Sequence, residues 1–131
     1  MKNMKTSKLS TYPFDDLYYA CTAFFSRKWQ LSILVYLSTG PKHFGEILKH
    51  HEGLSKKVLS YNLQKLVSKN VVSKREYKKG DVLMSEYALT KQGEEWQKIL
   101  EDLGEWGMKY SPNKKRWGSL LIFHFLYKAK P

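Results

Sequence analysis

The sequence predicts a mainly α-helical domain that carries one small β-hairpin. Apolar residues recur at helical spacing along much of the chain, which indicates amphipathic helices packed on a common core. Two short segments, 71–77 and 82–89, flank Gly80 and predict a hairpin with glycine in its turn. The 131 residues suffice for one domain, and a net charge of +11 favours an acidic partner.

Three helices are expected in the first half of the chain. The first begins after Pro13, where Asp15-Asp16 suits a helix start. The second runs from about Lys28 to Leu37 and ends before Gly40-Pro41, because glycine permits a left-handed cap and proline cannot continue a helix. A third, short helix fits His43 to His51. These helices would build one side of the core.

A helix-turn-helix is predicted around residues 52–55. Gly53 and an N-capping Ser55 separate two helical patterns by about four residues, the spacing at which two helices cross steeply. The fourth helix would run from Ser55 to about Ser68 and end at Asn70, which tolerates the left-handed conformation. Its apolar face comprises Leu59, Leu63 and Leu66. Its polar face comprises Lys56, Lys57, Ser60, Tyr61, Gln64 and Ser68.

The hairpin and a fifth helix complete the predicted fold. The strands 71–77 and 82–89 would flank a turn at 78–81, and Leu83 would share an inward face with other second-strand residues. Thr90 is expected to cap the fifth helix. A helix-turn-helix followed by a hairpin is a winged helix, in which one helix enters the major groove and the hairpin lies on the backbone or in the minor groove of DNA.

The positive charge is concentrated in the predicted recognition helix and hairpin. Residues 54–80 carry eight basic side chains against Glu76, whereas residues 86–108 have a net charge of −4. Such a basic segment favours nucleic acid, because each lysine beside a phosphate displaces condensed counterions. We therefore expect ten DNA-binding residues: Ser55, Lys56, Lys57, Ser60, Tyr61, Gln64, Lys74, Arg75, Lys78 and Lys79.

Two of these residues stand where folding alone would not place them. Lys56 and Lys57 lie in the first turn of the fourth helix, where the helix dipole disfavours cations by a few tenths of a kcal/mol each. A phosphate or a guanine edge would compensate for that cost. The same pair could instead be merely solvated, in which case it carries no function.

Other classes of function fit the residues less well. We expect no enzyme, no catalytic residues, no cofactor and no metal site, because the Gly40–Gly45 spacing lacks the Lys-Ser/Thr pair of a phosphate-binding loop and the four histidines lack ligand partners. The serious alternative is a winged-helix module that binds structured RNA or a protein. An exposed polar face on the fourth helix favours duplex DNA over that alternative.

Four motifs identify a family that the chain resembles. KW (28–29), GPKHFGEI (40–47), LSKKVL (54–59) and EYALTKQG (86–93) occur in the order and spacing of the HxlR-type winged-helix transcriptional regulators. The resemblance covers roughly Leu17 to Tyr110. The chain departs from the family where His43 replaces the usual arginine and Asn70 the usual glycine, and it lacks the family's Pro and Val shortly before Glu86.

The resemblance implies a cytoplasmic, homodimeric regulator that binds a double-stranded DNA operator, with terminal helices added to the winged helix for dimerisation. The domain would span 14–110, preceded by a flexible basic arm at 1–13 and followed by an extension at 111–131 that belongs to the dimer interface. A small-molecule effector of unidentified chemistry is a further expected partner, and a membrane is not. The expected dimer contacts are Leu17, Phe24, Trp96, Leu100, Leu103 and Trp106.

The single cysteine is expected to be structural. One cysteine forms no internal disulfide, which is typical of a reducing compartment. Redox-sensing members of the family resemble one another in a Cys-Pro pair, whereas Asp16 stands at that place here. Cys21 lies within an apolar helical pattern, so we expect a small buried hydrophobe. A redox role stays open only if Cys21 faces its twin across a dimer axis.

Overall fold

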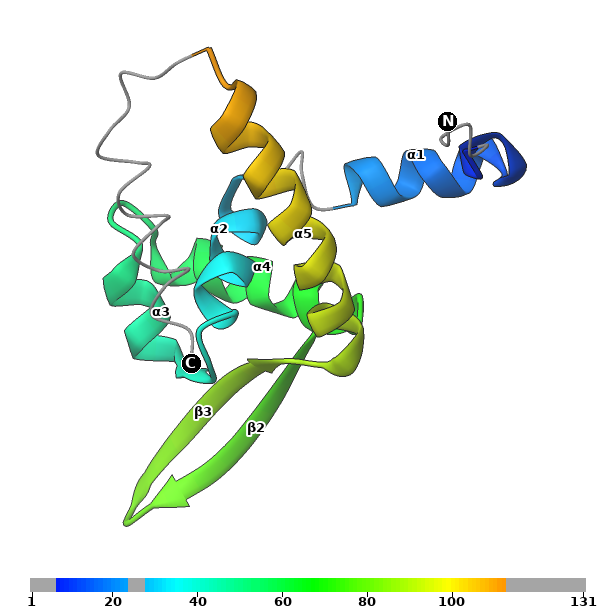
Figure 1. The fold of residues 1–131 in the computed structure, drawn as a ribbon. Coiled ribbons are helices and arrows are strands. Elements are labelled where there is room, and N and C mark those ends of the chain that lie inside the picture. Colours follow the sequence, from blue (N-terminus) through cyan, green and yellow to red (C-terminus); the bar gives the residue numbers. More distant parts are fainter. Residues whose placement is uncertain (1–6, 24–27, 113–131) are drawn as a thin grey trace.

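A computed structural model describes residues 7–23 and 28–112, and Figure 1 traces the chain through them. A short 3-10 helix at Leu9–Thr11 precedes the main elements. In chain order these are α1 (Phe14–Thr22), α2 (Lys28–Leu37), β1 (Lys42–His43), α3 (Phe44–His50), α4 (Lys56–Ser68), β2 (Val72–Lys79), β3 (Val82–Leu89) and α5 (Lys91–Tyr110). The fold is therefore mainly α with a small antiparallel sheet, as predicted.

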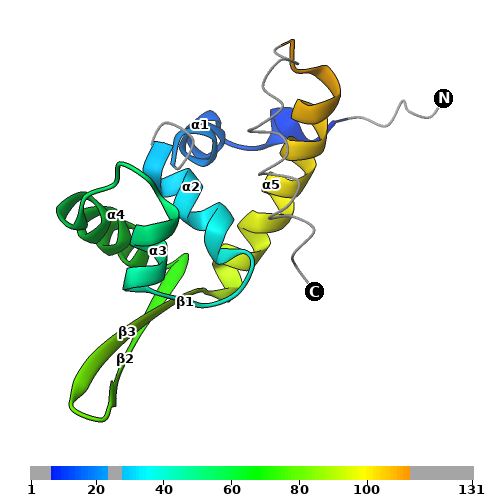
Figure 2. The same cartoon turned by 90° about the vertical axis from the view of Figure 1, so that its left-hand side faces the viewer.

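The hydrophobic core lies between α2, α3 and α4 and reaches the base of the sheet. Figure 2 shows α3 and α4 on one side of α2 and α5 on the other. Ile33 of α2 and Ile47 of α3 are fully buried. The predicted apolar face of α4 is confirmed, because Leu59, Leu63 and Leu66 are each at most 1% exposed. Burial of each such side chain contributes roughly 1.5–3 kcal/mol, so these contacts fix the crossing of α4 over α2.

The predicted helix ends are confirmed by hydrogen bonds and backbone angles. The Ser55 hydroxyl accepts the Val58 N–H at 3.1 Å, and the Thr90 hydroxyl accepts the Gly93 N–H at 3.1 Å. Gly53, in the turn between α3 and α4, has a φ of +87°. Asn70, which follows the end of α4, has a φ of +64°. Asparagine adopts this left-handed conformation more readily than most residues. The helix-turn-helix thus follows from local chemistry.

The sheet differs from the prediction in three ways. Its strand order is β1-β3-β2, because the short strand β1, which the sequence pattern did not reveal, pairs with β3. The wing, defined here as β2, β3 and their turn, has a tighter turn than expected: Lys79 pairs with Val82, so Lys78 and Lys79 lie in β2 and the turn is only Gly80-Asp81. Leu83 is 61% exposed rather than packed inward, because the outer half of the wing extends beyond the core.

The prediction that Cys21 is buried is wrong for the single chain. Cys21 is exposed, and none of the residues of α1 is buried. Figure 1 shows α1 projecting away from the rest of the molecule. An apolar helical pattern predicts that a helix buries a face, but it does not say whether the partner belongs to the same chain.

Several predicted features fall outside the described residues. They include Phe24, residues 1–6 of the basic arm and residues 113–131 of the C-terminal extension. Within the described part of the chain, no helix combines the length and hydropathy needed to cross a bilayer.

Candidate nucleic-acid interface

The outward face of α4 presents the polar side chains that the sequence predicted. Lys56, Lys57, Tyr61 and Gln64 are exposed, and Ser60 is half-buried at the edge of the core. The first turn of α4 contains no acidic residue, and neither lysine forms an ion pair with any described residue. Two unpaired cations therefore stand at the positive end of the helix dipole, which is unfavourable for the isolated protein.

A groove lies between α4 and the inner part of the wing. Its volume is about 220 Å³, and Ser60, Gln64 and Lys74 contribute to its walls together with buried Tyr87. It brings together two predicted DNA-binding residues of α4 and one of β2. Such a concave surface with hydroxyl, amide and ammonium donors suits the oxygens of a phosphate backbone.

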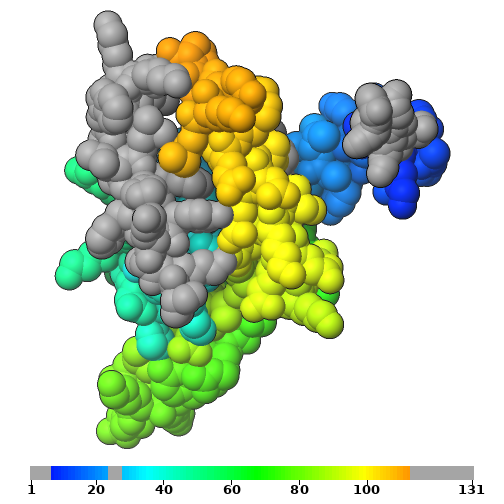
Figure 3. Space-filling model, in the orientation of Figure 1, coloured from blue at the N-terminus to red at the C-terminus, as the bar shows by residue number. Residues whose placement is uncertain are grey.

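The wing carries four predicted cations on two different faces. Strand alternation places Lys74 and Lys78 on the face toward α4, and Arg75 and Lys79 on the opposite face. Figure 3 shows the wing projecting from the rest of the molecule. A hairpin that lies along a duplex therefore presents only part of this charge to any one strand of DNA.

Ion pairs divide these four cations further. Lys74 Nζ lies 3.2 Å from Glu76 Oε2, and that hydrogen bond raises the pKa of Lys74. Arg75 Nη2 lies 2.9 Å from Glu86 Oε1. Lys78 and Lys79 form no ion pair within the described residues. Lys78 and Lys79 at the tip, like Lys56 and Lys57 on α4, therefore have no ion-pair partner among the described residues.

A buried polar network beneath α4 was not recognised from the sequence. Gln30 of α2 is 2% exposed and donates from Nε2 to Asn62 Oδ1 at 3.2 Å, and Asn62 donates in turn to the Val58 carbonyl at 2.8 Å. Lys69 Nζ donates to Gln30 Oε1 at 3.2 Å and to the Ala23 carbonyl at 2.7 Å. Satisfied buried polar groups fix relative orientation, so this network sets the rotation of α4 against α2.

Removing one member of this network should destabilise the fold. We expect Asn62→Leu to lower the free energy of unfolding by about 2 kcal/mol, because the Gln30 amide loses its acceptor inside the core. The double variant with Gln30→Leu should cost less than the sum of the single changes, because both partners become apolar. Urea denaturation measures all three variants, and strict additivity would show that the two amides do not depend on each other.

One exposed cation of α4 was also missed. Lys65 Nζ lies 5.4 Å from the centroid of the Tyr61 ring, so the two side chains form a cation–π contact on the outward face of α4. The signal was present in the sequence, since Lys65 follows Tyr61 by four residues. Within the residues that the structure describes, no group of three His, Cys, Asp or Glu side chains is arranged to hold a metal.

Comparison with known proteins assigns this arrangement to a family. The model of the HxlR-like helix-turn-helix family matches residues 24–115. The chain belongs to the HxlR family. It is 31% identical over 95 residues to a Bacillus subtilis protein named as the HTH-type transcriptional regulator YkvN. The aligned residues make up 72% of this chain and 80% of YkvN.

Solved structures share the fold. A transcriptional regulator of the MarR family from Enterococcus faecalis matches with a TM-score of 0.68 at 25% identity, over 88% of this chain and 99% of that chain. An HxlR family transcriptional factor from Thermoplasma volcanium matches in fold with a TM-score of 0.53 at 24% identity, over 64% of this chain and 74% of that chain. HxlR membership makes this chain a helix-turn-helix transcriptional regulator and not an enzyme.

Proposed function

We propose that the chain binds specific double-stranded DNA as a homodimer, with α4 in the major groove and the wing on the backbone or in the minor groove. The observation that carries the proposal is the first turn of α4, where two exposed lysines form no ion pair with any residue that the structure describes. Phosphate oxygens would supply that charge, and the N-terminal part of a recognition helix is the part that enters the groove.

The remaining predicted residues take roles that follow from their positions. Gln64 projects from the middle of the exposed face of α4, where an amide can form paired hydrogen bonds with adenine. Ser55, Ser60 and Tyr61 are placed to contact the backbone or a base edge. Lys74 contacts a phosphate from the groove beside α4, and Lys78 and Lys79, on opposite faces of the wing tip, contact different phosphates farther along the duplex.

Lysine removal tests the proposal. We expect the double variant Lys56→Ala and Lys57→Ala to bind duplex DNA roughly tenfold more weakly or worse, and to reduce the slope of log K against log salt by about 2. The probe is the duplex recovered by selection from a random-sequence pool, and fluorescence anisotropy at several salt concentrations measures the slope. The matched control is Lys91→Ala with Lys98→Ala, two exposed lysines on α5. An unchanged slope would show that the α4 lysines are only solvated.

The alternative function is tested with the same titration. A structured RNA hairpin of equal length serves as the competitor. Preference for the RNA, with the α4 lysines still required, would assign the basic surface to RNA and overturn the DNA proposal.

The homodimer is supported by apolar side chains on α1 and α5 that are exposed among the described residues. On α1, Phe14 is 74% exposed, and on α5, Trp106 is 64% exposed. A cleft of about 460 Å³ between the two helices is lined mainly by apolar groups, including half-buried Trp96 and exposed Ile99 and Leu103. Monomeric soluble proteins rarely expose such a patch. A second copy of this chain would cover it and present two α4 helices about 34 Å apart, one turn of duplex.

Of the other predicted interface residues, Leu17 and Leu100 do not line this cleft, and Phe24 lies outside the described residues. Leu17 on α1 and Leu100 on α5 are half-buried in the single chain, as expected for the edge of an interface. We keep 14–110 as the DNA-binding domain. Cytoplasmic location, the small-molecule effector and a redox role for Cys21 stay predictions.

A further inference from the structure

A hydrogen-bonded cluster joins the helix-turn-helix to the wing at the place where the wing leaves the core. His43, the last residue of β1, has its ring between two side chains: Nδ1 lies 3.2 Å from Glu46 Oε1, and Nε2 lies 2.6 Å from Tyr77 Oη. The Glu46 carboxylate also accepts the His43 backbone N–H at 2.8 Å, which lowers the pKa of Glu46. An ionised carboxylate only accepts hydrogen bonds, so Nδ1 carries a ring proton, and in the neutral imidazole Nε2 accepts the Tyr77 O–H.

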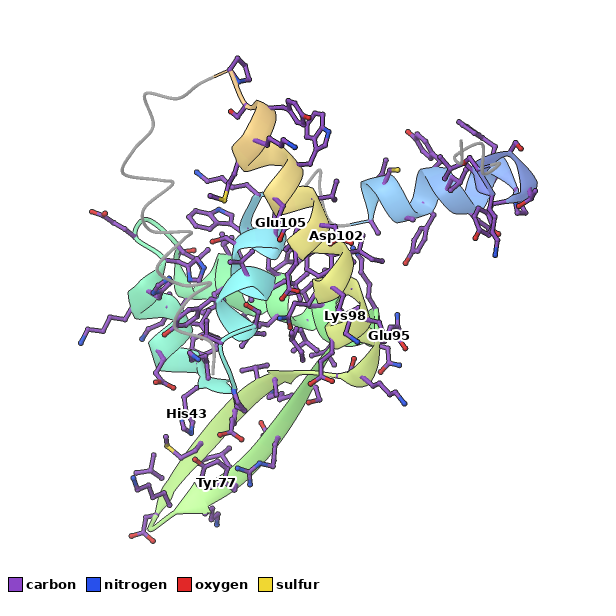
Figure 4. The ribbon with its side chains drawn as sticks, in the orientation of Figure 1. His43, Tyr77, Glu95, Lys98, Asp102 and Glu105 are labelled. Carbon is purple, nitrogen blue, oxygen red and sulfur yellow. The ribbon has the colours of Figure 1, made fainter. Side chains whose placement is uncertain are left out.

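This contact reaches across the sheet. Tyr77 lies on β2, which is separated from β1 by the middle strand β3. His43 pairs with Glu86 of β3, whereas Tyr77 pairs with Met84, two residues farther toward the tip. Figure 4 shows His43 at the start of α3 and Tyr77 on the wing below it. Within the described chain, no hydrogen bond or ion pair joins residues 78–83 to an element outside the wing. The His43–Tyr77 bond is therefore the side-chain hydrogen bond nearest the wing tip that joins the wing to the rest of the described chain.

The ring of Tyr77 is held on its face as well as at its hydroxyl. The guanidinium carbon of Arg75 lies 4.5 Å from the ring centroid, and Arg75 Nε and Nη2 donate to Glu86 Oε1 at 3.2 and 2.9 Å. One cluster therefore connects the start of α3 with both long strands. It leaves the outer nitrogen of Arg75 available to a phosphate, since the Arg75 side chain is 64% exposed.

A free hairpin of this length is an imprecise DNA contact. Strands of eight residues reach about 25 Å, so a swing of about 15° at the base displaces the tip by roughly 6 Å, which is about the width of the minor groove. Two linked contacts strengthen each other only when both can be made at once. The angle at the base of the wing therefore decides whether the tip lysines and α4 contact the same duplex.

We propose that the His43–Tyr77 hydrogen bond is a strut that holds the wing at a set angle to α4, with both residues acting as positioning residues for DNA binding. The inference rests on the proposed function for its consequence on DNA, but the geometry of the wing is testable without DNA. Tyr77→Phe is the sharpest variant, because it removes one oxygen and keeps the ring on which Arg75 lies.

Distance measurement between spin labels tests the strut directly. Labels are placed at Asp81→Cys in the wing turn and Lys49→Cys on α3, in a Cys21→Ser chain diluted with unlabelled protein. We expect one narrow distance distribution in this parent and a clearly broadened one with Tyr77→Phe or His43→Leu. His43→Gln, whose amide can still bond the Tyr77 hydroxyl, should restore the narrow distribution. Tyr12→Phe, which removes the hydroxyl of an exposed tyrosine outside the wing, is the matched control. An unchanged distribution with Tyr77→Phe would overturn the strut.

DNA binding then separates positioning from simple stabilisation. The selected duplex is used in full length and in a form trimmed of the base pairs that the wing protects. Tyr77→Phe should weaken binding to the full duplex about tenfold, the value of one well-placed hydrogen bond, and change binding to the trimmed duplex less than about twofold. Equal loss on both duplexes would mean that the hydroxyl only stabilises the fold. If the parent binds no duplex, the proposed function fails, while the spin-label result still decides the strut.

Discussion

Replacing Gly93 with alanine is expected to lower the free energy of unfolding by about 3 kcal/mol, although alanine is the better helix former. Gly93 lies in the first turn of α5 and is buried against the start of β2. A Cβ atom at this position would lie 2.2 Å from the carbonyl oxygen of Val71. That oxygen also accepts the N–H of Thr90 at 3.0 Å, so the backbone cannot retreat without losing this hydrogen bond to the N-cap residue of α5.

The sign of this effect is the informative part. On helix propensity alone, Gly→Ala inside a helix stabilises by about 1 kcal/mol. Gly45→Ala on α3 is the matched control, because nothing lies within 4 Å of its Cβ position, and we expect it to be neutral or slightly stabilising. Urea and thermal unfolding measure both variants, and the Gly93 variant should melt roughly 10 °C lower. A Gly93 variant as stable as the parent would show that α5 does not approach β2 this closely.

Charge introduced into the α1–α5 cleft should abolish the dimer. Leu103 is 46% exposed in the single chain and lines that cleft. In the dimer, Leu103→Glu would bury an unpaired carboxylate at the centre of the interface, which costs several kcal/mol. We expect the dimer Kd to rise at least about 100-fold. Analytical ultracentrifugation at micromolar concentration should then find a monomer that binds one half-site and loses affinity for the full site.

The control for this prediction lies on the same helix. Figure 4 shows Glu95, Lys98, Asp102 and Glu105 along α5. Glu105 is exposed and does not line the cleft. Glu105→Lys changes the side-chain charge by two units, more than the change made by Leu103→Glu. That variant should remain dimeric. A parent chain that sediments as a monomer at these concentrations would remove the dimer from the proposal and leave the single winged helix as the binding unit.

Helix ends and the course of the helix-turn-helix were predictable because their causes are local. A capping hydroxyl, a glycine or asparagine at a left-handed turn and a leucine repeat act within a few residues of one another, so Ser55, Asn70 and Thr90 could be assigned from the sequence. The exposure of the basic face of α4 was predictable from the same leucine repeat, because residues opposite a buried helical face point to solvent. The extent of the wing was less predictable, because the Lys79–Val82 pair is set by the two-residue turn between them.

The sequence by itself determined the class of the protein: its local patterns specify a winged helix, and its lysines specify an acidic partner. Only the tertiary structure decided which residues far apart in the sequence contact one another. It placed Gln30 against Asn62, His43 against Tyr77 and Gly93 against Val71, pairs separated by 32, 34 and 22 residues. It also left Cys21 exposed on a projecting helix. Periodicity reports that a face is apolar or polar, whereas the partner of that face depends on how the whole chain packs.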